Sequence, residues 1–264
     1  MTISGATALC FTLAHPAAHV RTPATFNALA AERGADIVMV PLDVAGDDLP
    51  AFLRAMRGMR NVTGAVVTIP HKSVAGRFCD ELSPRAQQCS AVNVIRRTSE
   101  GRLIGDVFDG LGFVGGLRGA GHAVEGRAVL LAGAGGAASA IAFALAEAGV
   151  SRLGVFNRTE ARARDLVDRV AKDYPRVWAE VAGADPTGFD IVVNATSLGL
   201  QPDDPLPVEA SKLSPAMLVA EAVMQPERTS LIAAAEAAGA ATHGGLAMLQ
   251  AQLALIAEFL VPER

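Results

Sequence analysis

The sequence predicts an α/β protein of two domains, in which helices pack on mostly parallel sheets. Short apolar runs alternate with helical stretches along the chain, a pattern typical of β–α–β units and of the parallel sheets they build. The alternation breaks once, at the glycine-rich polar segment 98–110, and then restarts. We therefore expect one domain over residues 1–106, completed by a C-terminal helix at about 240–264, and a second domain over 107–239.

The first hundred residues contain three apolar runs and two helical patterns. The expected strands are 6–13, 36–44 and 64–70. A helix is expected over 23–34, because Pro23 suits a first helical turn and Gly34 suits a helix end. A second helix is expected over 48–59, and the segment 98–110 has the composition of a linker or a hairpin.

The second half opens on an uncharged stretch, 128–146, that is long enough to span a membrane. Its order of aliphatic run, glycine cluster and alanine-rich run instead favours a strand, a tight turn and a buried helix. The expected elements are strands at 128–133, 152–157, 189–199 and 217–224, and helices at 137–149, 159–174, 229–238 and 245–260. Thr159 is expected to cap the helix that it begins.

Composition narrows the class of partner. Hydrophobic residues make up 51% of the chain and charged residues 19%, and the net charge of −4 gives no basic footprint. We therefore expect neither nucleic acid nor a membrane as partner. Three cysteines without a Cys-x-x-Cys pair, and an N-terminus without signal-peptide features, favour the reducing cytoplasm. His15 and His19 lack a third ligand nearby, so no metal site is expected.

The segment "GAGGAA" at 133–138 predicts a dinucleotide site. It follows a predicted strand and opens a predicted helix, and it fits the pattern G-x-G-x-x-G/A with Gly133, Gly135 and Ala138 in the three roles. The first glycine permits the tight turn, the second lets the backbone approach a pyrophosphate, and the third position lets the helix pack closely. The helix N-terminus then offers amide groups and a positive dipole end to phosphate.

The end of the next strand indicates which dinucleotide binds. An NAD site usually has an acidic residue there to bind the ribose 2′-hydroxyl. This chain has Asn157 instead, followed by Arg158 and, one helical turn later, Arg162. Two guanidinium groups can bind a 2′-phosphate that an acid would repel, so we expect the cofactor to be NADP.

Seven motifs in order resemble the shikimate dehydrogenase family: "VVTIPHK", "SAVNVI", "FDGLGF", "GAGGAA", "NRT", "NATSLG" and "MLQAQ". The resemblance extends over nearly the whole chain. It implies an N-terminal substrate domain, a Rossmann-type NADP-binding domain and a C-terminal helix that returns to the substrate domain. It also implies the NADP-dependent reduction of 3-dehydroshikimate to shikimate, a step of aromatic amino acid biosynthesis, by a monomer or a homodimer.

Matched position by position, the resemblance also implies the site residues. It makes Lys72 and Asp109 the catalytic pair. It gives substrate contacts to Thr68, Asn93 and Gln252, and cofactor contacts to Gly133, Ala134, Gly135, Gly136, Ala137, Asn157, Arg158, Thr159, Arg162, Thr196 and Ser197. Chemistry supports the pair independently, because a carbonyl oxygen that gains charge during hydride transfer needs a proton donor or a cation close by.

The sequence departs from the family pattern on the substrate side. The stretch "HVRTPATFN" at 19–27 has Val20 and Thr22 where the family has two serines that bind the substrate carboxylate. Val66 and Met224 stand where Asn and Tyr are usual, and Glu221 replaces an Asp. Val107 and Phe108 likewise replace Asn and Thr.

These departures leave the substrate open. Thr22 and Arg21 could hold the carboxylate together, since a guanidinium binds carboxylate directly, or Arg21 could be an ordinary solvated arginine. The chain is then either a divergent shikimate dehydrogenase or a related oxidoreductase for quinate or another cyclic hydroxy acid. A third possibility is an NADP-binding protein without catalytic activity.

Overall fold

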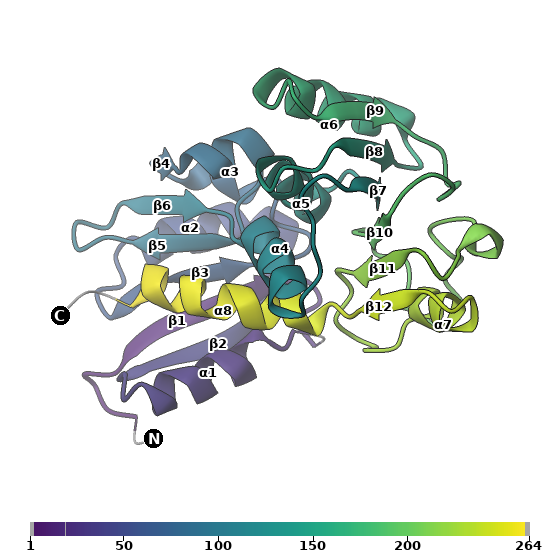
Figure 1. The fold of residues 1–264 in the computed structure, drawn as a ribbon. Helices are drawn as coiled ribbons and strands as arrows, with labels where there is room; N and C mark the ends of the chain where they lie inside the picture. The colour runs from purple at the N-terminus through teal and green to yellow at the C-terminus, as the bar shows by residue number, and fades with distance from the viewer. Residues whose placement is uncertain (1–2, 19, 262–264) are drawn as a thin grey trace. The chain divides into compact units, whose positions relative to one another are not determined.

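The computed structural model describes residues 3–18 and 20–261. Contacts between Cα atoms divide the chain into two compact units (Figure 1). The first unit extends to Phe108 and also contains the chain from Leu253 onward, and the second is Asp109–Gln252. The domain boundaries expected from the sequence, near residues 107 and 240, remain a prediction.

The first unit contains a six-stranded sheet of order β2-β1-β3-β5-β6-β4. Its strands are β1 (Ala8–Ala14), β2 (Ile37–Asp43), β3 (Val62–Val67), β4 (Glu81–Leu82), β5 (Val94–Arg97) and β6 (Leu103–Asp106). Only β5 is antiparallel to its neighbours, β3 and β6, so the sheet is mostly parallel as predicted. All six residues of β3 are buried, which explains its nearly continuous apolar sequence.

The helices of the first unit begin at recognisable signals. They are α1 (Thr22–Glu32), α2 (Leu49–Met56) and α3 (Pro84–Cys89), with two short 3-10 turns, η1 (Gly46–Asp48) and η2 (Ala75–Phe78). Pro23 lies in the first turn of α1, and Gly34 follows its end with a φ of +63°. Leu49, Leu53 and Met56 are buried at helical spacing and form the core-facing side of α2.

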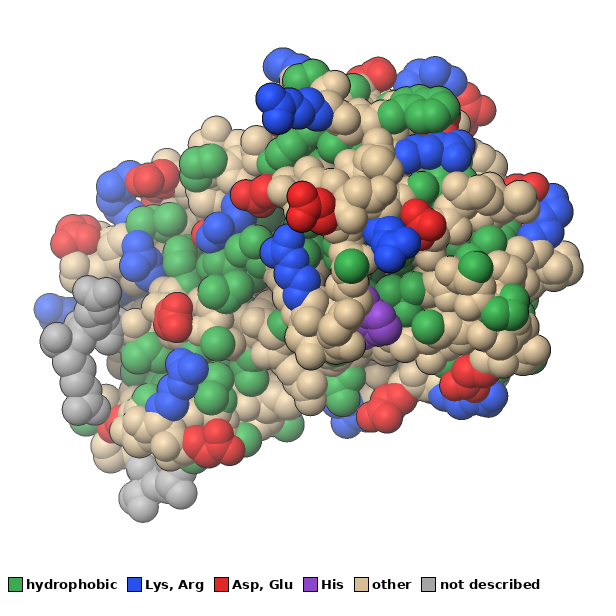
Figure 2. Space-filling view, in the orientation of Figure 1, with side chains coloured by type: hydrophobic (Ala, Val, Ile, Leu, Met, Phe, Trp, Pro, Cys, Tyr) green, Lys and Arg blue, Asp and Glu red, His purple; other side chains and the backbone are tan. Residues whose placement is uncertain are grey.

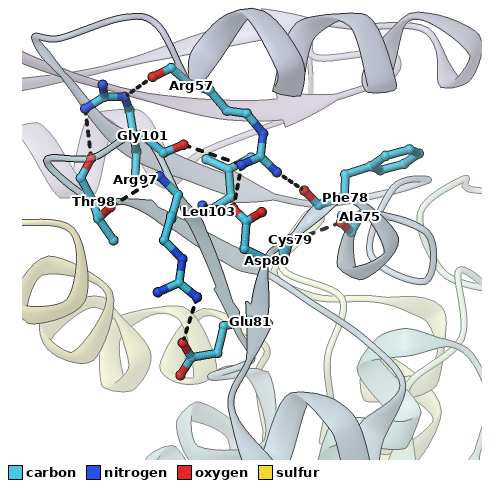
Figure 3. Close-up of polar contacts among 11 residues, drawn as sticks. Arg57, Ala75, Phe78, Cys79, Asp80, Glu81, Arg97, Thr98, Gly101 and Leu103 are labelled. Carbon is cyan, nitrogen blue, oxygen red and sulfur yellow. Dashed lines mark hydrogen bonds and ion pairs between the residues drawn. The ribbon is translucent and has the colours of Figure 1, made fainter.

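Arg57 and Arg97 form a cluster of hydrogen bonds that joins the end of α2 to the strands β4, β5 and β6 (Figure 3). Arg57 donates to the Asp80 carboxylate at 2.5 Å and to the carbonyl of Phe78 at 2.9 Å. Asp80 also accepts from the backbone amide of Leu103 at 2.7 Å, and Arg97 donates to the carbonyl of Arg57 at 2.9 Å. These bonds connect the end of α2 to β4, β5 and β6.

The second unit contains a fully parallel sheet of order β12-β11-β10-β7-β8-β9. Its strands are β7 (Ala128–Ala132), β8 (Arg152–Phe156), β9 (Trp178–Val181), β10 (Ile191–Asn194), β11 (Leu218–Glu221) and β12 (Ala241–His243). Counted from β7, this is the strand order 6-5-4-1-2-3 of a Rossmann fold. The order reverses between β7 and β10, and ligands bind such sheets at the carboxyl ends of the strands there.

The helices of the second unit connect these strands. They are α4 (Asp109–Gly119), α5 (Gly136–Glu147), α6 (Glu160–Asp173) and α7 (Ser230–Ala237), with a 3-10 turn, η3 (Ala210–Lys212), and helix α8 (Leu246–Leu260) passes from this unit into the first. The uncharged stretch 128–146 is the strand β7, a turn and α5, as predicted. In the described part of the chain, no helix is both long and apolar enough to cross a membrane.

Several details differ from the predictions. The strand expected to reach residue 70 ends at Val67, because Thr68 onward forms a turn with a cis bond before Pro70. Thr159 precedes α6 as predicted, but its side chain makes no capping hydrogen bond. The helices α3 and α4 were not predicted, because the glycines of α4 and the shortness of α3 give weak helical patterns.

Charged side chains of both signs are interspersed over the face shown in Figure 2. Several arginines of the second unit are paired with carboxylates on the same helix or the neighbouring strand, as in Arg164 with Glu160 at 2.6 Å and Arg152 with Glu180 at 2.5 Å. Such pairs contribute little to stability individually.

Candidate active site

The first unit carries Lys72 just beyond the carboxyl end of β3. Thr68 and Lys72 are half-buried, and His71 between them is buried, with Nε2 2.8 Å from the carbonyl of Val44. The backbone carbonyl of Lys72 accepts from the amide of Val92 at 2.9 Å. The turn after β3 is thereby fixed from two sides, so Lys72 extends from a held backbone.

Asn93 connects this turn to the segment that leads to Asp109. Its carbonyl accepts from the amide of Val67 at 2.7 Å, at the end of β3. Its side-chain Oδ1 accepts from the amide of Phe108 at 2.9 Å, and Asp109 is the next residue in the chain. Asn93 is buried, so both bonds lie away from solvent. The predicted substrate residue Asn93 therefore also has a structural task.

An ion pair between buried Asp106 and exposed Arg85, which sequence reasoning missed, supports the same segment. Asp106, at the end of β6, accepts from Arg85 Nε at 2.8 Å and Arg85 Nη2 at 2.6 Å, and from the Ser83 hydroxyl at 2.5 Å. Its Oδ1 also accepts from the amide of Val107 at 2.7 Å. The Arg85 guanidinium lies 4.8 Å from the centre of the Phe108 ring. The sequence signal that could have revealed this pair is an aspartate at the end of a strand.

The loop with the altered carboxylate motif lies at the same edge of the first sheet. The amide of His15, just after β1, donates to the carbonyl of Ile69 at 3.1 Å, which ties this loop to the turn that contains Thr68. Thr22 is buried at the start of α1, Val20 is half-buried and Arg21 is exposed. The first unit thus gathers Thr22, Thr68, Lys72 and Asn93 at one edge of its sheet.

The second unit holds the predicted phosphate cradle. Gly133 has a φ of +119°, and a Cβ there would lie 2.8 Å from the carbonyl oxygen of Ala195, so only glycine fits. Helix α5 begins at Gly136, and its first backbone bond runs from the amide of Ser139 to the carbonyl of Gly135. The preceding amides, those of Gly136 to Ala138, have no partner within the helix and can bind an anion.

The predicted 2′-phosphate clamp follows β8. Asn157 Nδ2 donates to the carbonyl of Thr159 at 2.9 Å, which holds the turn before α6. Arg158 and Arg162 are exposed, and within the described residues neither guanidinium forms an ion pair. Arg164, by contrast, is paired with Glu160. The two arginines assigned to the cofactor are therefore available to bind an anion.

Asn194 organises the loop that follows β10. Its Oδ1 accepts from the amide and the hydroxyl of Thr196 at 3.0 and 2.7 Å, and Thr196 Oγ1 accepts from the amide of Leu198 at 3.0 Å. Its Nδ2 donates to the buried carboxylate of Glu221 on β11. Burial raises the pKa of Glu221 to about 6. Ser197 is exposed in this loop.

Asp109 and Gln252 lie on adjoining helices of the second unit. Asp109 is the first residue of α4 and is 2% exposed, and Gln252, on α8, is also buried. One turn after Asp109, a Cβ at Gly112 would lie 2.6 Å from the carbonyl of Met248 and 2.7 Å from Gln252 Cβ. Gly112 therefore lets α8 approach the turn of α4 that begins with Asp109.

Comparisons with known proteins show relatives along most of the chain. Profiles of the shikimate dehydrogenase substrate binding domain and of shikimate / quinate 5-dehydrogenase match residues 12–95 and 118–200. A Rubrobacter xylanophilus protein named shikimate dehydrogenase (NADP(+)) is 40% identical over 94% of this chain and 88% of its own.

Two solved structures are similar over almost the whole chain. Shikimate 5-dehydrogenase from Thermus thermophilus, in complex with NADP(H) and shikimate, has a TM-score of 0.86 at 32% identity over 97% of this chain and 95% of that one. The ligand-free 5-ketofructose reductase of Gluconobacter sp. strain CHM43 has a TM-score of 0.85 at 31% identity over 97% and 93%.

Proposed function

This chain belongs to the shikimate dehydrogenase family, and we propose from that premise that it catalyses the reversible, NADP-dependent reduction of 3-dehydroshikimate to shikimate. The observation that carries the proposal is the cofactor half-site of the second unit. The glycine turn opens onto α5 where the strand order reverses, and the next strand is followed by two arginines without an ion-pair partner among the described residues, instead of an acid. That set of groups suits a dinucleotide with a 2′-phosphate.

We assign the proton transfer to Lys72 and Asp109. NADPH, when bound, supplies the hydride that reduces the substrate carbonyl. The carbonyl oxygen gains negative charge as this happens, and the Lys72 ammonium can donate a proton to it. The Asp109 carboxylate is suited to orient the lysine and to pass protons on. In the oxidative direction, neutral Lys72 accepts the proton from the hydroxyl group.

We assign the substrate hydroxyls and carboxylate to the polar groups of the first unit and of α8. Thr68 and Asn93 lie at the sheet edge that carries Lys72, and Gln252 lies on the helix beside α4. Thr22 and Arg21 are the candidates for the carboxylate, because they stand in the loop that the family uses for it. Small molecules are then the only partners required, and we expect a cytoplasmic monomer or homodimer.

A related substrate is the second candidate. Val20 is half-buried and Val66 is buried on β3, so neither position offers the polar group that the family pattern has there. A net hydrogen bond to a charged group contributes about 1.5–3 kcal/mol, so losing two without replacement would weaken substrate binding about a hundredfold or more. The profile that names quinate favours quinate or another related cyclic hydroxy acid as the alternative, and one structural relative is named for a different substrate, 5-ketofructose.

A substrate panel tests both candidates. Purified protein is assayed with shikimate, quinate and neutral ring analogues, each with NADP and with NAD. We expect the highest kcat/KM for shikimate with NADP, and a preference for quinate or a neutral ring would select the second candidate. Lys72→Ala should lower kcat by orders of magnitude while NADPH affinity stays close to that of the wild type. Comparable turnover in the two proteins would refute the role of Lys72, and no turnover of any compound would favour a binding protein.

A further inference from the structure

Glu221 is a buried carboxylate that the proposed reaction does not use. It ends β11, is 1% exposed and accepts hydrogen bonds from three donor groups of the second unit. Asn194 Nδ2 lies 3.1 and 3.0 Å from its two oxygens, the Thr229 hydroxyl donates at 2.8 Å, and the amide of Val223 donates at 3.3 Å. A carboxylate that accepts bonds from separate segments holds those segments together.

The bonds reach the loop 195–200 through one side-chain amide. Asn194 Nδ2 faces Glu221 and the carbonyl of Leu198, at 2.9 Å from the latter, while its Oδ1 faces the amide and hydroxyl of Thr196. The other side of this loop packs on the glycine turn, since a Cβ at Gly133 would lie 3.3 Å from the amide nitrogen of Thr196. The loop therefore lies between Glu221 and the phosphate cradle.

We propose that Glu221 is a positioning residue whose ionised carboxylate fixes the orientation of the Asn194 amide and, through it, the cofactor-facing loop 195–200. An ionised carboxylate can only accept hydrogen bonds, so it requires the NH₂ group of Asn194 to face it. The Asn194 oxygen then has to face Thr196, as observed. A protonated Glu221 becomes a donor as well, so it no longer enforces this orientation, and only the Leu198 carbonyl and the Thr196 amide and hydroxyl still favour it. The link to the cofactor rests on the proposed function, whereas the effect on the loop does not.

Other charged groups lie near Glu221 on the elements around it. On β12, His243 lies opposite Ala220, the residue before Glu221, and burial and His122 lower the pKa of His243. Just after the loop, the Asp204 carboxylate accepts from the amides of Gly199 and Gln201. Two further charged groups from the segment before α7 and from α7 itself, Arg228 and Glu236, are paired with each other at 2.8 Å. The pKa of Glu221, raised to about 6, places its protonation just below neutral pH.

The first test uses the cofactor-free protein and measures backbone hydrogen exchange in the loop. Glu221→Gln keeps the shape but places an NH₂ group where an acceptor is needed, so the amides of Thr196 and Leu198 should exchange about tenfold faster at pH 7.5. Glu209→Gln is the matched control, because it removes a carboxylate that is exposed and paired only with Lys212 among the described residues. Loop exchange in Glu221→Gln equal to that in the control would overturn the proposal.

The second test needs only the wild-type protein, so it stands even if Glu221→Gln does not fold. After correction for the intrinsic pH dependence of exchange, protection of the Thr196 and Leu198 amides should fall between pH 7 and pH 5. The midpoint of that fall should equal the pH at which the Glu221 carboxyl group titrates, as measured by ¹³C NMR. Protection that is constant across that range, or that follows another group, would contradict the proposal.

The third test connects the loop to the cofactor. If the ionised form binds NADPH better, binding must lower the pKa of Glu221, and at pH 6 the complex should release protons. Calorimetry in buffers of different ionisation enthalpy measures that release, which should be absent in Glu221→Gln. Proton uptake, or identical release in the variant, would overturn the link to the cofactor. Wild-type protein that fails to bind NADPH at all would refute the proposed function, while the exchange measurements would still decide the role of Glu221.

Discussion

Gly112→Ala should damage both stability and activity, because the added methyl group has no room between α4 and α8. Its carbon would lie 2.6 Å from the carbonyl oxygen of Met248 and 2.7 Å from Gln252 Cβ. Carbon atoms pack at about 3.5–4.0 Å, so one helix must move by about 1 Å. Overpacking of this kind lowers the free energy of unfolding by about 1–3 kcal/mol. A 1 Å displacement between positioned groups can lower activity about a hundredfold, and here it separates Asp109 from Gln252.

Gly115→Ala is the matched control on the same helix. Gly115 is exposed, and a Cβ there would lie 3.5 Å from Ala251 Cβ, which is ordinary contact. Alanine should therefore stabilise α4 by about 0.5–1 kcal/mol through helix propensity. Urea unfolding and steady-state kinetics of both variants measure the two effects. The reasoning is refuted if Gly112→Ala has wild-type stability and kcat/KM, or if both variants are damaged equally.

Three further predictions follow from single contacts. Arg158→Ala should weaken NADPH binding far more than NADH binding in fluorescence titrations, whereas Arg164→Ala, which removes a paired arginine, should change neither; equal losses for both cofactors would exclude a 2′-phosphate clamp. Asp106→Ala leaves Ser83 and the exposed Arg85 without their acceptor, and it should lower the free energy of unfolding by about 2 kcal/mol. A change below about 1 kcal/mol would mean that water replaces the bonds. The third prediction concerns His243, whose pKa in the folded protein is lowered by burial and by His122. The unfolded chain therefore binds a proton at this histidine more readily than the folded protein does. The free energy of unfolding should fall as pH decreases below the ordinary histidine pKa. In His243→Phe this fall should become shallower, and an unchanged slope of unfolding free energy against pH would contradict the assignment.

Glu221 acts on stability in the opposite direction to His243. Its pKa is higher in the folded protein than the ordinary value of 4.5, so the folded state binds the proton more tightly. The stabilisation is present at low pH and is lost as pH rises from 4.5 through about 6, by about 2 kcal/mol in total. Glu221→Gln at pH 7.5 avoids this desolvation cost but leaves its amide facing the Val223 N–H.

Much of the second unit could be predicted because its signals are local. The run 128–138 contains the strand, the tight turn and the helix start in order, so the spacing alone placed Gly133 and the start of α5. Asn157, Arg158 and Arg162 follow the next strand at fixed distances along the chain. Elements with weak local patterns were missed, as α4 shows: its glycines give little helical propensity, and Gly110 and Gly112 are required by contacts with α5 and α8.

The sequence by itself predicted the α/β class, the dinucleotide turn and the two arginines after the next strand, because each depends on residues close together in the chain. Lys72 became a candidate only through the order of motifs along the whole chain. The tertiary structure decided which distant residues meet. It brought Gly112 against Gln252, Glu221 against Asn194, and Asp106 against Arg85. Those pairs are separated by 140, 27 and 21 positions in the chain. Hydrogen bonding and close packing act through space, so no periodicity or motif spacing could have revealed them.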